Sequence, residues 1–239
     1  MLIIPMQEHE SAPAQLCLDA RLAGRLAALN PSVIDICSRF APARKAVEGF
    51  IADVYKRTYG ADIAVTYPTL MSVRDANGYI LAACGFRMAE TEPLFLERYT
   101  GAPVESLLEA RIGHAVARGE VAEIGNLASG GQGASLFLFA ALSMFLNARG
   151  VRHAVITGTD VLTRRLHKMG LQPAVLCEAD PSALEAEERR KWGSYYETSP
   201  RVLAGTLDES VRHLQDALGM SYKDASQTLY TRLHHRVQA

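Results

Sequence analysis

Residues 123–171 read EIGNLASGGQGASLFLFAALSMFLNARGVRHAVITGTDVLTRRLHKMGL, and this stretch decides the fold. The pattern predicts a strand over residues 121–124, a helix over 135–149 and a second strand over 151–157. Apolar residues almost surround the helix, so we expect it to be buried against a sheet. Gly150 ends the helix, and the branched residues after it are typical of an interior parallel strand. The stretch is therefore predicted to be a βαβ unit.

The turn before this helix, Ser129–Ala134, is rich in glycine. A turn that opens a helix directs unpaired backbone N–H groups, and the positive end of the helix dipole, at any anion bound there. Taken alone, the turn is more typical of a simple entry into the helix.

The composition is that of an ordinary globular protein, with 239 residues of which 49% are hydrophobic and 21% charged. A net charge of −1 gives no electrostatic reason to expect nucleic acid or an anionic membrane as a partner. The four cysteines have no metal-ligand spacing and no paired framework, so we expect no metal site and a cytoplasmic protein. No apolar run reaches the roughly 18 residues that span a bilayer.

The rest of the chain divides into three predicted parts. Residues 1–40 are weakly patterned, with small apolar patches around Leu22, Leu26 and Leu29, and are expected to form an N-terminal arm. Residues 41–205 form the main domain, with a helix over 42–59, a hairpin over 69–88 that turns at Asn77-Gly78, a helix over 103–117, a strand over 171–177 and a helix over 181–191. Residues 206–239 are expected to be a helical extension of two helices broken at Gly219, which could cap the domain or mediate a homodimer.

This order of elements resembles the GNAT acyltransferase superfamily. The turn at 129–134 lies where that superfamily has an Arg/Gln-x-x-Gly-x-Gly/Ala motif, and Lys168 and Gly170 match its later Tyr-x-Lys-x-Gly-Phe motif, with Leu166 in place of the tyrosine. The resemblance implies an α/β (α+β) fold, namely a GNAT-like mixed central sheet flanked by helices, with a C-terminal helical tail.

A narrower resemblance, to the thermostable hemolysin family, covers about residues 45–205. It is carried by Tyr59-Gly60-Ala61, Gly85-Phe86-Arg87, Leu94-Phe95-Leu96-Glu97-Arg98-Tyr99, Glu123-Ile124-Gly125-Asn126-Leu127-Ala128, Thr157-Gly158-Thr159, Lys168-Met169-Gly170-Leu171 with Pro173, and Trp192-Gly193-Ser194-Tyr195-Tyr196.

That family is similar to GNAT proteins, including acyl-homoserine-lactone synthases. The resemblance therefore implies an N-acyltransferase that uses acyl-CoA or an acyl carrier protein as donor, a small amine as acceptor and no permanently bound cofactor. One alternative is an inactive GNAT-like binding scaffold. Another is a protein associated with hemolysis. The sequence shows no spanning helix, no barrel-like strands and no secretion signal, which argues against a membrane-damaging toxin, so hemolysis would come from an amphiphilic product of the protein.

The resemblance also implies how the donor is bound. Free backbone groups of the splayed strand 121–127 would pair with the pantetheine arm at Ile124, Gly125 and Leu127, and Gly125 would tolerate a bulge there. The pyrophosphate of coenzyme A, or the phosphate of a carrier-protein arm, would be held by the N–H groups of the turn, which are those of Gly130, Gly131, Gln132, Gly133 and Ala134.

The resemblance implies that Glu123 is the general base, because in GNAT enzymes a carboxylate on this strand often takes the proton of the attacking amine, directly or through water. Burial would raise its pKa toward neutrality, where a base works best. The alternative is a structural ion pair with Arg87 or Arg111. Asn126 would orient the substrate or a water molecule, or cap a turn.

The acceptor is expected to lie near Arg87, which would bind a carboxylate, and near Trp192, Tyr195 and Tyr196, which would line a pocket or form a packed lid. In the superfamily a tyrosine usually acts as the general acid, and Leu166 takes its place here. His167, Tyr195 or Tyr196 could protonate the leaving thiolate instead, or the thiolate could leave without a proton donor. Glu97 and Arg98 would form a salt-bridged loop or bind the acceptor.

Overall fold

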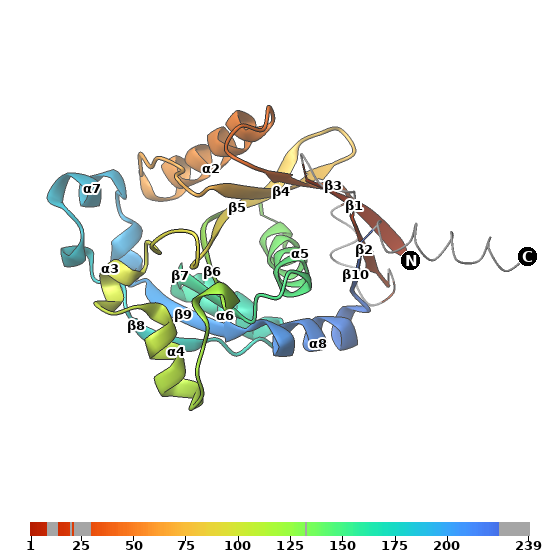
Figure 1. Cartoon of the computed structure of the whole chain (residues 1–239). Coiled ribbons are helices and arrows are strands. Elements are labelled where there is room, and N and C mark those ends of the chain that lie inside the picture. Colours follow the sequence, from red (N-terminus) through yellow and green to blue (C-terminus); the bar gives the residue numbers. More distant parts are fainter. Residues whose placement is uncertain (9–13, 20, 22–29, 132, 225–239) are drawn as a thin grey trace, which may run out of the picture.

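The computed structural model describes residues 1–8, 14–19, 21, 30–131 and 133–224. Its strands form one mixed sheet in the order β10-β2-β1-β3-β4-β5-β6-β7-β9-β8, with helices on both faces (Figure 1). The mixed α/β fold class predicted from the sequence is confirmed. The strands are β1 (Leu2–Glu8), β2 (Ala14–Leu18), β3 (Pro31–Cys37), β4 (Thr69–Asp75), β5 (Ile80–Met88), β6 (Val121–Ser129), β7 (His153–Gly158), β8 (Ala174–Glu178), β9 (Arg201–Thr206) and β10 (Ser221–Asp224). The helices are α2 (Arg44–Tyr59), α3 (Glu97–Thr100), α4 (Val104–Ile112), α5 (Ala134–Ala148), α6 (Asp160–Lys168), α7 (Ala186–Lys191) and α8 (Leu207–Leu218).

The two-residue period of the strands separates the two faces of the sheet. Leu70 and Ala83 are buried with Ile51 of α2, whereas their neighbours Met71 and Ala82 are buried in the cluster that contains α5. The nearly all-apolar helix α5 therefore lies against one face, as its sequence predicts, and α2 lies against the other (Figure 1).

The predicted hairpin is confirmed. Strands β4 and β5 pair antiparallel, and the Asp75 carboxylate accepts hydrogen bonds from the backbone N–H groups of Asn77 and Tyr79 in the turn. The central βαβ unit is confirmed as well, because β6 and β7 run parallel and α5 connects them.

The expected N-terminal arm is wrong, since the first residues build part of the sheet. Strand β1 pairs antiparallel with β2 and parallel with β3, and its alternate residues Ile4 and Met6 are fully buried. Pro5 lies within β1, where it interrupts the apolar alternation in the sequence. The patches at Leu22, Leu26 and Leu29 lie outside the described residues.

The rest of the chain differs from the prediction in three places. Strand β9 had no counterpart among the predicted elements, yet it lies between β7 and β8 in the sheet. Helix α4 ends at Gly113, whose φ of 79° stops it before residue 117. Helix α8 is confirmed, but strand β10 follows Gly219 where a second helix was expected, and residues from 225 onward lie outside the described part of the chain. The boundaries at residues 40 and 205 stay predictions.

Candidate functional site

The central strands separate at one end. Parallel pairing between β6 and β7 runs from Val121 and His153 to Ile124 and Ile156, whereas β6 continues to Ser129 and pairs there only with β5 among the described strands. Between Gly125 and Ala128 the pairing with β5 shifts register, and Asn126 adopts a φ of 49°, which marks a bulge. The splay and the bulge expected from the resemblance are therefore present.

Two cavities meet at this split. The first, of about 320 Å³, is walled largely by aromatic side chains, and we call it the aromatic cavity. The second, of about 340 Å³, lies between α2, the end of β6 and the start of α6, and we call it the turn cavity. Both are lined by Tyr55, Gly125, Thr157 and Tyr195, so this quartet marks their junction.

Glu123 is buried beneath the aromatic cavity rather than in its wall, with 1% of its surface exposed. Its carboxylate accepts the backbone N–H groups of Phe95 (2.8 Å) and Leu96 (3.0 Å). Arg87 Nε lies 3.3 Å from Glu123 Oε2, so the ion pair weighed as an alternative is formed. Burial raises the pKa of the Glu123 carboxyl, although the Phe95 N–H and the Arg87 guanidinium oppose the shift.

Arg87 does line the aromatic cavity, as expected for a group that binds substrate. Its guanidinium lies 4.4 Å from the ring centroid of Tyr67, and its Nη1 donates to the Pro93 carbonyl (3.3 Å). The guanidinium is thus held between Glu123, an aromatic face and a carbonyl at the cavity wall.

The glycine-rich turn uses several of its N–H groups internally. Those of Gly130, Gly131 and Ala134 donate to the Leu81 carbonyl, Ser129 Oγ and the Gly131 carbonyl. Gln132 lies outside the described residues. Arg165 of α6 lines the turn cavity and donates to Ser135 Oγ (3.2 Å) in the first turn of α5. A cation therefore lies beside the helix N-terminus, where an anion would be stabilised by both.

The aromatic residues predicted near the acceptor gather at the cavity. Trp192 and Tyr195 line it, with their ring centroids 5.2 Å apart. Tyr196 does not line the cavity, but its hydroxyl is hydrogen-bonded to the Tyr99 hydroxyl (2.5 Å), and Tyr99 does line it. The Tyr195 hydroxyl donates to the Thr157 carbonyl (3.2 Å), and burial raises its pKa well above the ordinary value.

Asn126 also lines the aromatic cavity, as does Tyr55, and its side chain slightly opposes the rise that burial causes in the pKa of Tyr55. Ile124 lines the same cavity and Leu127 the turn cavity, so residues 124–127 of β6 run past the junction. Glu97 and Arg98 are engaged in ion pairs with Arg118 and Glu188, which agrees with the salt-bridged loop.

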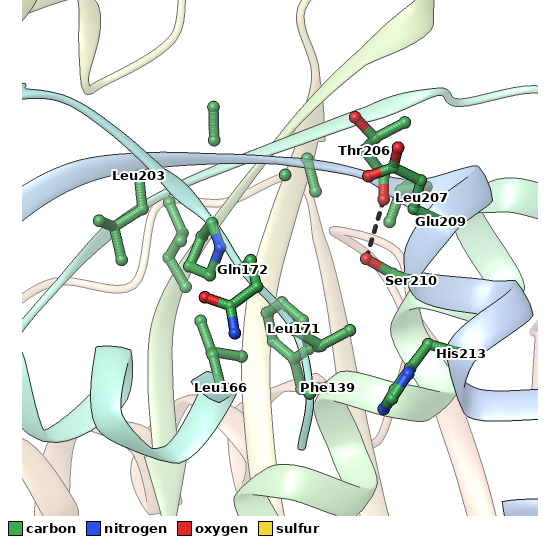
Figure 2. Close-up of a pocket in the computed structure, with 16 residues that line it drawn as sticks. Phe139, Leu166, Leu171, Gln172, Leu203, Thr206, Leu207, Glu209, Ser210 and His213 are labelled. Atoms are coloured by element: carbon green, nitrogen blue, oxygen red, sulfur yellow. Dashed lines mark hydrogen bonds between the residues drawn. The ribbon is translucent and has the colours of Figure 1, made fainter. Parts of the chain in front are cut away.

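His167, which was considered as a proton donor, and Leu166, at the position of the expected tyrosine, both lie away from the split. His167 is exposed on α6 and lines neither cavity at the split. Leu166, where the resemblance leads one to expect a tyrosine, points into a separate cavity between α6, β9 and α8 (Figure 2). That distal cavity of about 150 Å³ is mostly apolar and has Glu209, Ser210 and His213 along one side.

Sequence reasoning missed Tyr55, Tyr67, Thr157 and Arg165. Thr157 Oγ1 is buried at the junction without a hydrogen-bond partner among the described residues. Tyr55 lies on the apolar face of α2, where its hydroxyl gave no signal, and Arg165 was one of several cations on an amphipathic helix. Only Tyr67 comes from an irregular segment, between α2 and β4.

Within the described ranges, no three His, Cys, Asp or Glu residues lie together as a metal site would require. The four cysteines are free thiols. None of the helices in the described part of the chain is long and apolar enough to cross a membrane.

Comparison with known proteins places this geometry in context. The solved structure of FeeM, an N-acyl amino acid synthase from uncultured soil microbes, matches with a TM-score of 0.51 and 13% identity, over 76% of this chain and 94% of that one. The CoA-dependent acyl-homoserine lactone synthase MesI matches with a TM-score of 0.48 and 14% identity, over 79% and 96%. A comparison with curated protein sequences gave no match. The family model for thermostable hemolysin matches residues 38–211, and the chain therefore belongs to the thermostable hemolysin family.

Proposed function

We propose that this protein is an N-acyltransferase that moves an acyl group from an acyl thioester to a small amine. The split between β6 and β7 carries the proposal, because two cavities approach it from different sides and meet at Gly125. A thioester in one cavity and an amine in the other would be brought together there, which is the main requirement for a reaction between two bound substrates. The fold shared with FeeM, an N-acyl amino acid synthase, supports this reaction class.

The turn cavity suits the donor. Residues 125–129 of β6 have one edge free of β7, so an extended pantetheine arm could add main-chain hydrogen bonds there as an extra strand does. Arg165 and the start of α5 provide positive charge for a phosphate group. These features suit both donors under consideration, acyl-CoA and the phosphopantetheine arm of an acyl carrier protein.

The aromatic cavity suits the acceptor. Its walls of Tyr55, Phe95 and Trp192 would pack against an apolar or aromatic body, and Arg87 could pair with a carboxylate. An amino acid bound by its carboxylate at Arg87 could direct its amine toward Gly125. The acceptor class is therefore an amino acid or a similar small amine.

The test is amide formation by the purified protein. It is incubated with a series of acyl-CoA esters, or with acyl carrier protein loaded with the same chains, together with a mixture of amino acids, and the products are identified by mass spectrometry. A donor that binds only the folded protein, present at a concentration 100 times its Kd, should also raise the free energy of unfolding by about 2.7 kcal/mol.

A glycine pair supplies the matched variants. A Cβ atom at Gly125 would lie 1.9 Å from Tyr67 Oη, so Gly125→Ala must displace that ring at the junction and should slow amide formation about 10²-fold. Gly205→Ala introduces the same methyl group into another strand with no atom within 4 Å, and should keep the rate.

Donor binding without amide formation would indicate the inactive scaffold instead. Lysis of erythrocytes by the purified protein without any thioester would indicate a direct membrane-damaging protein. Either result would contradict the proposed acyltransferase.

A further inference from the structure

Glu123 has no room for a substrate amine. The two carboxylate oxygens each accept a backbone hydrogen bond, from Phe95 N–H and Leu96 N–H, and Arg87 Nε lies 3.3 Å from Oε2 as an ion pair. Tyr67 is next to this ion pair, because the Arg87 guanidinium contacts both its ring and Glu123, and its hydroxyl interacts with the same carboxylate. With 1% of its surface exposed, Glu123 can exchange a proton with the aromatic cavity only through a neighbour.

Tyr67 is the neighbour that joins Glu123 to the junction. Its ring lies across Gly85 and Gly125, which are paired across β5 and β6, and a Cβ atom at either glycine would meet it within 2.5 Å. The hydroxyl lies directly over Gly125, which lines both the aromatic and the turn cavity. Two glycines at paired positions thus make room for one hydroxyl at the split.

The position of Tyr67 is fixed from behind. The buried guanidinium of Arg44 donates through Nη2 to the Tyr67 carbonyl (2.6 Å) and through Nη1 to the Pro68 carbonyl (3.0 Å). The Arg87 guanidinium covers the ring at 4.4 Å. Although Tyr67 lies outside any helix or strand, it is held as firmly as a core residue.

The other tyrosines of the aromatic cavity are engaged elsewhere. Tyr55 interacts with the Asn126 side chain, and Tyr99 hydrogen-bonds to Tyr196. Tyr195 donates to the Thr157 carbonyl. Tyr67 lines the same cavity, its hydroxyl lies over Gly125, and its ring contacts the guanidinium that pairs with Glu123.

We propose that the Tyr67 hydroxyl relays the proton of the attacking amine to Glu123, an inference that rests on the proposed acyltransferase function. The amine nitrogen attacks the thioester carbonyl carbon and forms the C–N bond. Tyr67 Oη accepts the proton from that nitrogen while its own proton passes to the Glu123 carboxylate. The C–S bond then breaks, the thiolate leaves with the electron pair and takes a proton from water, and Glu123 returns its proton to solvent through Tyr67.

The test compares Tyr67→Phe with the wild type in the amide-forming assay, over a range of pH. Phenylalanine keeps the ring over Gly85 and Gly125 and removes only the hydroxyl. We expect kcat/KM to fall roughly 10²- to 10⁴-fold, the usual contribution of general acid–base catalysis, with little change in donor binding. The kcat/KM of Glu123→Gln should fall by a similar factor. The kcat/KM of the double variant should be no lower than that of either single variant, because both residues act in one relay. The control is Tyr79→Phe, on an exposed tyrosine in the hairpin turn, which should keep the wild-type rate.

The pH profile separates a relay from a structural role. In the wild type, kcat/KM should rise with pH as Glu123 loses its proton, and this limb should disappear in Tyr67→Phe. A Tyr67→Phe variant that retains the rate and the limb would overturn the relay and leave the acyltransferase standing. Absence of amide in the wild type with every donor would overturn both.

Discussion

At the scale of single residues, the burial of Glu123 has a consequence for stability as well as for catalysis. Burial raises the pKa of its carboxyl above the ordinary value of 4.5. Between 4.5 and the raised value, the folded protein therefore binds more protons at this site than the unfolded chain does. Where the folded state binds more protons, the free energy of unfolding falls as the pH rises.

We therefore expect the stability difference between wild type and Glu123→Gln to depend on pH. The contribution of Glu123 is fully present below about pH 4.5 and is lost as the pH rises through the folded pKa, since the charged form is then buried. Denaturant unfolding of both proteins between pH 4 and pH 8, at constant ionic strength, measures the difference. Glu187→Gln, at a side chain that is 75% exposed, is the control for removing one carboxylate. A difference that grows in favour of the wild type with rising pH would show instead that the hydrogen bonds from Phe95 and Leu96 outweigh burial.

The candidate site could be predicted only in part, for reasons that also lie at this scale. Glu123 and Arg87 lie on strands beside recognisable turns, so their positions follow from the pattern of the sheet. Tyr67 could not be located, because its segment lies across Gly85 and Gly125 only after α2 and β4 have packed. Its one local signal is the proline that follows it, which favours extended backbone at Tyr67.

At the scale of elements, the segment between β5 and α4 connects the site to a charged cluster. Its backbone supplies the two N–H groups bound by Glu123, and its side chains Phe95 and Tyr99 line the aromatic cavity. Arg118 holds this segment from outside, with bonds to both carboxylate oxygens of Glu97, to Glu105 (2.6 Å) and to the Ala89 carbonyl (2.8 Å).

Arg118→Met should therefore lower the free energy of unfolding by about 1.5–3 kcal/mol, the range for hydrogen bonds to charged groups, and should weaken acceptor binding. Arg152→Met is the matched control, because the Arg152 side chain is 58% exposed and its ion pairs are longer than 3.5 Å. It should cost no more than about 1 kcal/mol. Chemical denaturation of the three proteins measures both effects, and equal losses in the two variants would show that the Arg118 cluster does not stabilise this segment.

The elements themselves were predictable where local chemistry decides them. The Asn-Gly turn specified the β4–β5 hairpin, and the apolar run of α5 specified a buried helix. Strand β9 gave too weak a pattern, because its six residues include the small Ala204 and Gly205 and it depends on pairing with both β7 and β8.

At the scale of the whole molecule, the two terminal parts of the chain complete the sheet together. Strand β10 pairs antiparallel with β2, and β2 pairs with β1 (Figure 1). Met220, between α8 and β10, is 1% exposed and belongs to the same core cluster as Ile4 and Leu16. A sequence pattern could not show this, since the pairing joins residues some two hundred positions apart.

We expect removal of residues 219–224 to destabilise the protein through the first strands of the sheet. Two matched chains end at residue 218 and at residue 224, so the difference between them isolates Met220 and β10. Loss of the buried Met220 side chain alone should cost roughly 1.5–3 kcal/mol. The shorter chain also exposes the edge of β2, which favours association by strand pairing, so its apparent mass in sedimentation should rise with concentration. Equal stability of the two chains would contradict the pairing of β10 with β2, whereas equal mass with lower stability would show that the exposed edge is protected by its own side chains.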